Sequence, residues 1–410
     1  MSSPPFHINH NVYILGAGFS KEAGLPVLSD FLQVMRETRA TGALSPEENT
    51  AIDAILHFRR YASIAAAQTH IDLNNLEDLL SLAAAVPPDP TQTQGGSLSD
   101  LSIAIGAVLE HRQRIYAKSG SKYTIQAPID VLTKNIPKWE RSASGKIYGH
   151  GVTPTHAKVP AMDMYLAIMT SFLGGKDGQK NTLITFNYDT LIEEAFTRMG
   201  ISFTYGLNPL YAMCSMQLPE TLPMKWMGDA TDDLPQLLKL HGSINWAEED
   251  RSPITLESDL NRAPQPTKPF VYDDFKSLRQ SERWPMIEPP TWRKNQNDIL
   301  RLSWNEAVKQ LKTATRIIIM GYSCPETDPH FRFLLAAGLL ENIALTKVWV
   351  INPDIEAFKR VQSMLSGERS GVPVQHVGQI SQLFASIGSL EEIGRRPQCW
   401  TGPPTLRGIR

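Results

Sequence analysis

The sequence predicts an α/β fold in which a Rossmann-like parallel sheet carries a large, mostly helical insertion. Short β-branched or aliphatic runs recur along the chain, and each is followed directly by small or polar residues: 12–15, 182–185, 237–240 and 317–320. Between the first two runs lies a long stretch with apolar residues at helical spacing. Strands that alternate with helical segments are typical of parallel sheets, because each parallel pair needs a crossover connection.

The segment after the first strand is patterned mainly as helix. From residue 21 to about residue 86, apolar residues recur with polar faces between them. Residues 87–96 are rich in Pro and Gly, which predicts a loop. A second helical stretch covers about 98–118, and residues 119–160 have no clear period, so we expect irregular structure there.

The pattern of strand and helix resumes after residue 160. Helical spacing predicts helices over 161–173 and 190–199, on either side of the second strand. Residues 205–236 are expected to form a long, loop-rich excursion. Residues 247–297 form a Pro-rich excursion, in which residues 284–285 and 288–292 are expected to form a rigid wall rather than regular structure.

The last part of the chain adds two late strands, 317–321 and 347–352, and then a final strand over 374–377. A short helix over 380–387 and a tail rich in Pro, Gly and Arg follow. We therefore divide the chain into four parts: the first strand and glycine loop (1–26), the mostly helical insertion and linking segment (27–180), the remainder of the sheet domain (181–390) and the C-terminal tail (391–410).

Composition excludes several classes of protein. The 410 residues include 40 Lys and Arg against 42 Asp and Glu, and no basic cluster marks a nucleic-acid groove. Three widely spaced cysteines are too few for a disulfide framework or a four-cysteine zinc site. No charged and apolar leader opens the chain, and no run of 18 apolar residues occurs. We expect a soluble, cytoplasmic protein.

Glycine and serine follow the first strand. Gly16, Ala17, Gly18 and Ser20 could bring backbone N–H groups close to a pyrophosphate, although such a loop also occurs in simple tight turns. In an open α/β sheet, ligands bind at the carboxyl ends of the strands. A hydride-transfer enzyme would place an acidic residue about 20 positions later at a strand end. Glu37 has that spacing but lies in a helical pattern, which disfavours this reaction.

Polar residues also follow the second and third strands. Asn187 and Asp189 could face a ribose or a water molecule, or could cap the helix that starts near Thr190. His241 ends an apolar strand and precedes Gly and Ser, so its ring should project toward the same crevice as a base. The other nine histidines are interpreted as structural or surface residues, and none has zinc-ligand spacing, so no metal is expected.

A third set of small and polar residues follows the two late strands. Gly321 and Ser323 again allow close backbone approach, and Asn352 could bind an adenosine ribose. The tripeptide Asn352-Pro353-Asp354 equally favours a simple turn. Cys324 is interpreted as a small buried thiol rather than a nucleophile.

The ordered set of motifs resembles the sirtuin-like NAD-binding family, in particular its prokaryotic branch of NAD-consuming antiviral defence proteins. The resemblance implies a phosphate-binding loop, a segment that meets the nicotinamide ribose and carboxamide, a general base, a second phosphate loop and an adenosine-ribose ligand. These correspond in turn to Gly16, Ala17, Gly18 and Ser20; Asn187 and Asp189; His241; Gly321 and Ser323; and Asn352.

Two differences from the protein-deacylating sirtuins indicate which branch of the family the sequence resembles. Protein-deacylating sirtuins usually carry a four-cysteine zinc module and a substrate-binding segment after the His, and this sequence has neither. Residues 284–290, Trp-Pro-Met-Ile-Glu-Pro-Pro, look like the proline-rich segment of the defence branch. We therefore expect an NAD glycohydrolase that makes nicotinamide and ADP-ribose or its cyclic form. The alternatives are a non-catalytic subunit that binds NAD or ADP-ribose and, less favoured, a deacylase.

The resemblance also implies partners. NAD depletion is toxic when unrestrained, and no separate sensor domain is evident in the sequence. The family then implies a homo-oligomer and a partner protein such as a HerA-type ATPase or a short Argonaute. NAD is expected as the substrate, with no metal cofactor and no membrane attachment.

Overall fold

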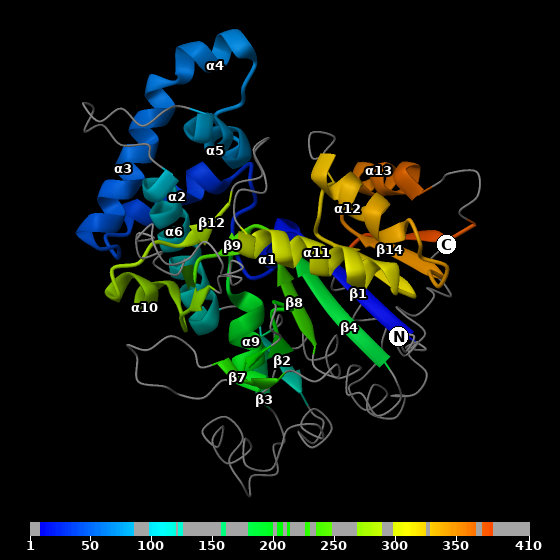
Figure 1. Cartoon of the computed structure of the whole chain (residues 1–410). Coiled ribbons are helices and arrows are strands. Elements are labelled where there is room, and N and C mark those ends of the chain that lie inside the picture. Colours follow the sequence, from blue (N-terminus) through cyan, green and yellow to red (C-terminus); the bar gives the residue numbers. More distant parts are fainter. Residues whose placement is uncertain are drawn as a thin grey trace, which may run out of the picture.

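A long sheet runs through the described part of the chain and carries helices on both faces (Figure 1). The computed structural model describes residues 9–85, 98–119, 122–125, 157–160, 179–199, 203–207, 211–213, 226–229, 235–247, 269–288, 298–324, 329–365 and 371–379. Within these residues the sheet has nine strands in the order β15-β14-β13-β1-β4-β8-β5-β6-β7. The strands are β1 (Asn9–Leu15), β4 (Gln179–Thr185), β5 (Phe203–Thr204), β6 (Tyr211–Met213), β7 (Trp226–Asp229), β8 (Gln236–Lys239), β13 (Arg316–Met320), β14 (Lys347–Ile351) and β15 (Val374–Val377).

The seven strands from β15 to β5 pair in parallel, and only β6 and β7 add antiparallel edges. The α/β class expected from the sequence is therefore confirmed. β1 lies in the middle, with Leu15 level with Met320 of β13 and with Thr185 of β4. The chain leaves β1 toward β4 and returns on the other side as β13. This reversal of strand order opens a crevice at the carboxyl end of β1, where ligands bind in such sheets.

Side chains of β1 alternate between two apolar layers. Val12 and Ile14 pack with helices α11 (Asp298–Lys312), α12 (Pro329–Leu339) and α13 (Ile355–Leu365). Tyr13 and Leu15 pack on the opposite side with α9 (Leu191–Met199) and the N-terminal helices. Both faces are covered, so the central strands are mainly apolar, as expected for parallel strands buried on two sides. They also bury polar or charged side chains, among them Asn11, Asn181 and Lys239.

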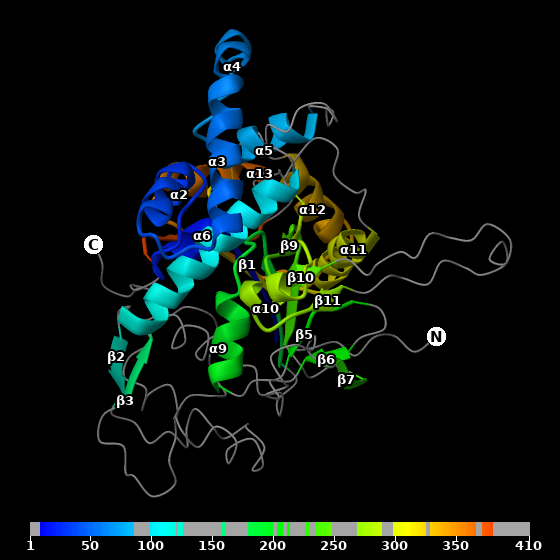
Figure 2. The same cartoon turned by 90° about the vertical axis from the view of Figure 1, so that its left-hand side faces the viewer.

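The helical region expected after the first strand is present. It contains α1 (Ala17–Lys21), α2 (Phe31–Ala40), α3 (Pro46–Tyr61), α4 (Ser63–Thr69), α5 (Leu76–Ala85) and α6 (Leu98–Ser119). The start of α3 is set by a capping box between Ser45 and Glu48, with Pro46 in the first turn. Helix α6 runs diagonally past α2 and α3 in Figure 2 and packs on both, so it ties the helical region together.

Three segments expected to lack regular structure contain short elements instead. The stretch 119–160 contains the hairpin of β2 (Lys122–Ile125) and β3 (Ala157–Pro160), and 205–236 contains β6 and β7. The stretch 247–297 contains β11 (Phe270–Val271), α10 (Phe275–Gln280) and β12 (Met286–Ile287); β11 pairs with β10 (Trp246–Ala247). Strands of two to four residues are too short to show a period of two, so their sequences gave no signal.

Several expectations lie outside the described residues. They are the loop 87–96, the helices 161–173 and 380–387, and the tail from residue 391. The division of the chain at residues 26, 180 and 390 stays a prediction.

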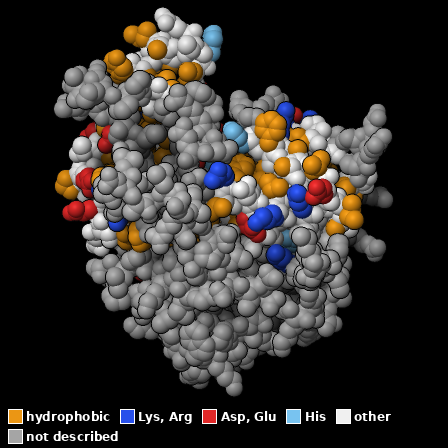
Figure 3. All heavy atoms as spheres, viewed as in Figure 1, with side chains coloured by type: hydrophobic (Ala, Val, Ile, Leu, Met, Phe, Trp, Pro, Cys, Tyr) orange, Lys and Arg blue, Asp and Glu red, His pale blue; other side chains and the backbone are white. Residues whose placement is uncertain are grey.

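The surface over α11 and α12 mixes charges of both signs (Figure 3). Lys309 pairs with Glu306, and Lys312 pairs with Glu341. The basic side chains on this face are therefore locally compensated. Among the described residues, no helix is long and apolar enough to cross a membrane.

Candidate functional site

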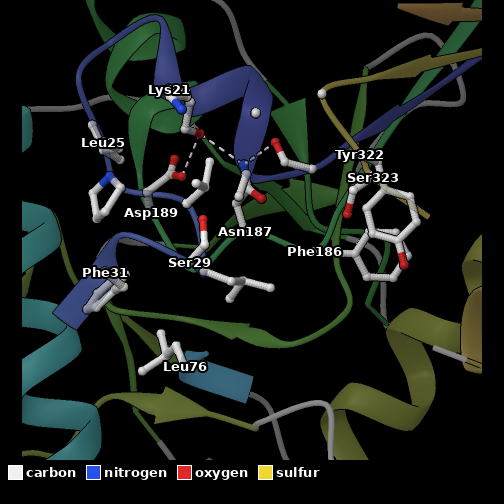
Figure 4. Close-up of a pocket in the computed structure, with 18 of the residues that line it drawn as sticks. Lys21, Leu25, Ser29, Phe31, Leu76, Phe186, Asn187, Asp189, Tyr322 and Ser323 are labelled. Atoms are coloured by element: carbon white, nitrogen blue, oxygen red, sulfur yellow. Dashed lines mark hydrogen bonds between the residues drawn. The ribbon is translucent and has the colours of Figure 1, made fainter. Parts of the chain in front are cut away.

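A cavity of about 750 Å³ opens at the carboxyl ends of β1, β4, β13 and β14. All ten residues that the sequence singled out line it: Gly16, Ala17, Gly18, Ser20, Asn187, Asp189, His241, Gly321, Ser323 and Asn352. The helical region supplies a wall through apolar side chains. Figure 4 shows Phe31 and Leu76 across the pocket from Asn187 and Asp189. The fold thus brings together five segments of the chain, and the first and last of these site residues, Gly16 and Asn352, are 336 positions apart in sequence.

The glycine loop is packed against the second loop. Gly18 N donates to Gly321 O at 2.8 Å, and Gly16 N donates to Met320 O at 3.0 Å. A Cβ at Gly16 would lie 2.7 Å from Tyr322 Cα, and one at Gly18 would lie 2.7 Å from Gly321 O. The sequence analysis assigned these glycines to a phosphate. The structure shows that contact between the two loops already requires them.

Ser20 joins the glycine loop to the segment after β4. It lies inside α1 and is buried, so it does not cap that helix, whose N-cap is Gly16. Its Oγ donates to Asp189 Oδ2 at 2.7 Å and accepts from Asn187 Nδ2 at 2.9 Å. Asn187 Nδ2 also donates to Gly16 O at 3.0 Å. Asn187 therefore holds the loop and faces the cavity at the same time.

Asp189 caps the following helix, which is one of the two roles that the sequence left open, and it also binds Ser20. Its Oδ1 accepts from Leu191 N at 3.2 Å, which satisfies an N–H in the first turn of α9, while Oδ2 accepts from Ser20. Burial raises the pKa of this carboxyl group, while the nearby Lys239 ammonium and the Ser20 hydroxyl lower it. An ionised carboxylate here depends on these partners.

His241 follows β8 at the edge of the cavity and is 5% exposed. Its ring centroid lies 5.3 Å from that of Phe186 and 6.3 Å from that of Trp304. Trp304 Nε1 donates to Leu240 O at 2.9 Å, which fixes the peptide just before the histidine. The base that the sequence predicted is thus held in an aromatic setting next to the pocket.

The backbone after His241 is engaged by a later segment. Strand β9 (Gly242–Ser243) pairs antiparallel with β12, and Glu288 N donates to His241 O at 3.0 Å. Gly242 has φ +82°, and a Cβ there would lie 2.0 Å from Met286 O. Part of the proline-rich segment therefore forms a strand against the histidine loop, between the two stretches for which the sequence predicted a wall without regular structure.

Asn352, which the sequence analysis expected to bind an adenosine ribose, is held by backbone contacts. Asn352 Nδ2 donates to Tyr322 O at 3.0 Å, and its Oδ1 accepts from Asp354 N at 2.9 Å. The turn expected for this tripeptide is confirmed, and the side chain also ties two loops together. Ser323 is exposed. The Tyr322 ring stacks on Phe186 with centroids 4.8 Å apart (Figure 4).

The sequence analysis missed some residues at the site. The helical region contributes Leu25, Ser29, Glu77 and Leu109 to the lining, and no local motif marks them, because tertiary packing places them there. Beneath the pocket, Lys239 is 1% exposed. A charged residue inside the apolar strand 237–240 was a visible signal for that position.

Metal ligands do not gather in the described part of the chain, which contains no group of three or more His, Cys, Asp or Glu suited to an ion. Cys324 is buried, with Sγ 3.7 Å from Met364 Sδ, as expected for a small structural thiol. Cys214 and Cys399 lie outside the described residues.

Comparison with known proteins places the site in context. Residues 181–365 match a family model described as a SIR2-like domain. Solved structures that resemble the chain include one described as "Structural Basis for the Mechanism and Regulation of Sir2 Enzymes" (13% identity, 94% of this chain and 92% of that chain, TM-score 0.36). A second is a Sir2 homologue triple mutant with 2'-O-acetyl ADP-ribose (13% identity, 94% of this chain and 90% of that chain, TM-score 0.32). A third is a Sir2 homolog–NAD complex (14% identity, 95% of this chain and 89% of that chain, TM-score 0.33). No curated protein matches the sequence. Residues 181–365 are thus similar to a SIR2-like domain, and the first strand and glycine loop lie in the same sheet and line the same pocket.

Proposed function

We propose that the protein is an NAD glycohydrolase, which cleaves NAD to nicotinamide and ADP-ribose or its cyclic form. One observation carries the proposal: all ten residues selected from the sequence line a single cavity at the switch point of the sheet. Its volume of about 750 Å³ falls in the range of small-molecule sites. The match of residues 181–365 to a SIR2-like domain supports the same ligand.

Cleavage of the bond between nicotinamide and ribose requires few groups of the protein. The nicotinamide ring of NAD carries a positive charge, so it leaves with the bonding electron pair as a neutral molecule and needs no proton. Positive charge then develops on the ribose, and water attacks C1'. Asn187 orients the ribose or the water, and His241 accepts the proton that the water releases. For the cyclic product, a nitrogen of the adenine replaces water as the nucleophile.

The remaining predicted residues bind rather than react. Gly16, Ala17, Gly18, Ser20, Gly321 and Ser323 surround the phosphates, Asp189 supports the nicotinamide end, and Asn352 supports the adenosine ribose. Because Asn352 already bonds to two backbone groups, one amide proton and one lone pair of Oδ1 are left for a ligand. We expect it to act mainly by shaping the loop.

A peptide substrate is disfavoured by the surroundings of His241. Extended peptides often bind by adding a strand to an open sheet edge. Beside His241 the short strand β9 is already paired with β12 of the same chain. Three cysteines in the whole sequence also cannot form a four-cysteine zinc module. Both points favour glycohydrolase over deacylase.

The proposal extends to a cellular role on the strength of the motif resemblance. The protein would be a cytoplasmic NAD-depleting effector in bacterial anti-phage defence, assembled as a homo-oligomer. Its activity would be restrained until a partner, such as a HerA-type ATPase or a short Argonaute, responds to infection. The near-complete burial of His241 favours a resting form that turns over slowly. The burial of His241 is equally consistent with the second candidate function, that of a subunit that binds NAD or ADP-ribose without cleaving it.

The test follows nicotinamide and ADP-ribose after purified protein is mixed with NAD, with and without an acetyl-lysine peptide. We expect peptide-independent release that His241→Ala and Asn187→Ala abolish. His57→Ala, an exposed residue of α3, is the matched control and should keep full activity. Binding of NAD without release would support either an effector that needs its activating partner or the non-catalytic subunit, and release only with peptide would support the deacylase.

A further inference from the structure

A buried ion pair lies directly beneath the candidate site. Lys239 of β8 is 1% exposed, and its Nζ donates to Glu193 Oε1 at 2.8 Å and to Asp189 O at 2.5 Å. Tyr205 donates its hydroxyl to the same Glu193 oxygen at 3.2 Å. Burying a charged lysine costs free energy unless its ammonium group interacts with other polar groups, so the burial of Lys239 needs an explanation.

Hydrogen bonds connect this cluster to Asn187 in a fixed order. An ionised Asp189 can only accept, so the Ser20 hydroxyl must donate to it. Ser20 then offers only lone pairs to its other neighbour, and it accepts from Asn187 Nδ2. The second proton of that amide goes to Gly16 O. Both amide protons are therefore committed within the protein, and the carboxamide can present only its oxygen to a ligand.

We propose that Lys239 is a positioning residue of the site: its ammonium group keeps Asp189 ionised, and Asp189 orients Ser20 and through it the Asn187 carboxamide toward NAD. The inference rests on the proposed function in one respect, namely that Asn187 contacts NAD. Lys239 itself is buried below the pocket and acts only through Asp189.

The charged groups around Asp189 are few, so the effect of each can be predicted. Lys239 from β8 lowers the pKa of Asp189, whereas Glu193 from α9 raises it. Helix α1 contributes the Ser20 hydroxyl, which donates to Asp189, and the charged Lys21, which lines the same pocket. Helix α6 contributes the neutral Gln113, which bonds to Thr190 and to Glu194. Tyr205 stays protonated, because burial raises its pKa well above the usual range.

Three variants test the proposal through the net charge of the cluster. With Asp189 ionised, the cluster carries two negative charges and one positive charge. Lys239→Met removes the positive charge, so Asp189 should hold its proton to higher pH. Glu193→Gln removes a negative charge, so Asp189 should lose its proton at lower pH. The double variant loses one charge of each sign and keeps the net charge of the native protein.

The measurement is NAD affinity against pH in a His241→Ala background, in which NAD is held without being cleaved. We expect the acidic limb of the binding profile to move to higher pH in Lys239→Met and to lower pH in Glu193→Gln. The double variant should return close to the parent profile although its ion pair is gone. The direction of these shifts is the readout that a purely structural role would not produce.

The proposal is overturned if both single variants move the limb in the same direction, or if neither moves it. Should Lys239→Met fail to fold, Glu193→Gln and the double variant still decide, because replacing both members of a buried pair is tolerated better than removing one. Failure of the proposed function would look different: the native protein would release no nicotinamide, while the binding profiles could still shift as expected.

Discussion

At the scale of single residues, the glycines of the site are required mainly by contact between protein loops. Gly321 has φ +61°, and a Cβ there would lie 2.1 Å from Phe19 N. Its neighbours across the gap are Gly16 and Gly18, whose own Cβ atoms would clash in turn. The two loops can therefore approach only because three positions lack side chains, whether or not a ligand is bound.

This predicts a large loss of stability in Gly321→Ala. The left-handed conformation costs an alanine roughly 1–2 kcal/mol, and overpacking against the backbone adds about 1–3 kcal/mol. Gly24→Ala is the matched control, because Gly24 has φ +76° but no atom within 4 Å of its Cβ position, so only the conformational cost applies. Urea unfolding of both variants measures the difference. Equal losses would contradict the account of the loop contact.

At the scale of elements, helices α6 and α10 are joined by a buried carboxyl group. Glu110 of α6 accepts from Lys276 N at 2.8 Å and contacts Arg114, while Asp274 caps α10 beside it. Burial and, to a lesser degree, the charge of Asp274 raise the pKa of Glu110 to about 7. The folded protein therefore holds this proton more tightly than the unfolded chain does.

The sign of the pH dependence follows. Between about pH 4.5 and pH 7 the unfolded chain loses the Glu110 proton first, so the stability contributed by this group is full at low pH and falls as pH rises. Glu110→Gln removes this dependence and should gain up to about 3 kcal/mol on the parent between those limits. Urea unfolding at pH 5 and pH 8 tests it, with the exposed Glu341→Gln as control. Parallel pH curves for parent and Glu110→Gln would rule it out.

Some strands and helices could be predicted from the sequence, and others could not. Strands β1, β4, β8, β13 and β14 were predictable because short runs dominated by β-branched, aliphatic or aromatic residues are followed by small or polar residues. Helices α2, α3 and α6 were predictable from their spacing. The pairing of β9 with β12 was not, because two-residue strands have no period and their partners are 43 residues apart. The ten candidate residues could be expected to line one cavity because strand ends meet at one edge of the sheet, whereas the helical wall depends on packing that no local pattern records.

At the scale of the whole molecule, the pocket joins parts of the chain that are distant in sequence. Its lining runs from Gly16 to Gln379 and includes the helical region as well as five strand ends. A ligand that fills it contacts groups that separate on unfolding, so it binds the folded state and not the unfolded chain. Ligand binding should therefore be visible as stability, even in a resting form that does not turn over.

We expect NAD to raise the free energy of unfolding by about 2.7 kcal/mol at a concentration 100 times its dissociation constant. Thermal unfolding across an NAD titration measures the shift. His57→Ala should keep the shift, because its side chain is far from the lining, and Asn187→Ala should reduce it strongly. Nicotinamide mononucleotide, which lacks the adenosine half, should shift less than NAD, because it leaves the side of the pocket at Ile351 and Asn352 without contacts. A protein whose unfolding is unchanged by any of these ligands would not be an NAD-binding protein, and the cavity would need another occupant.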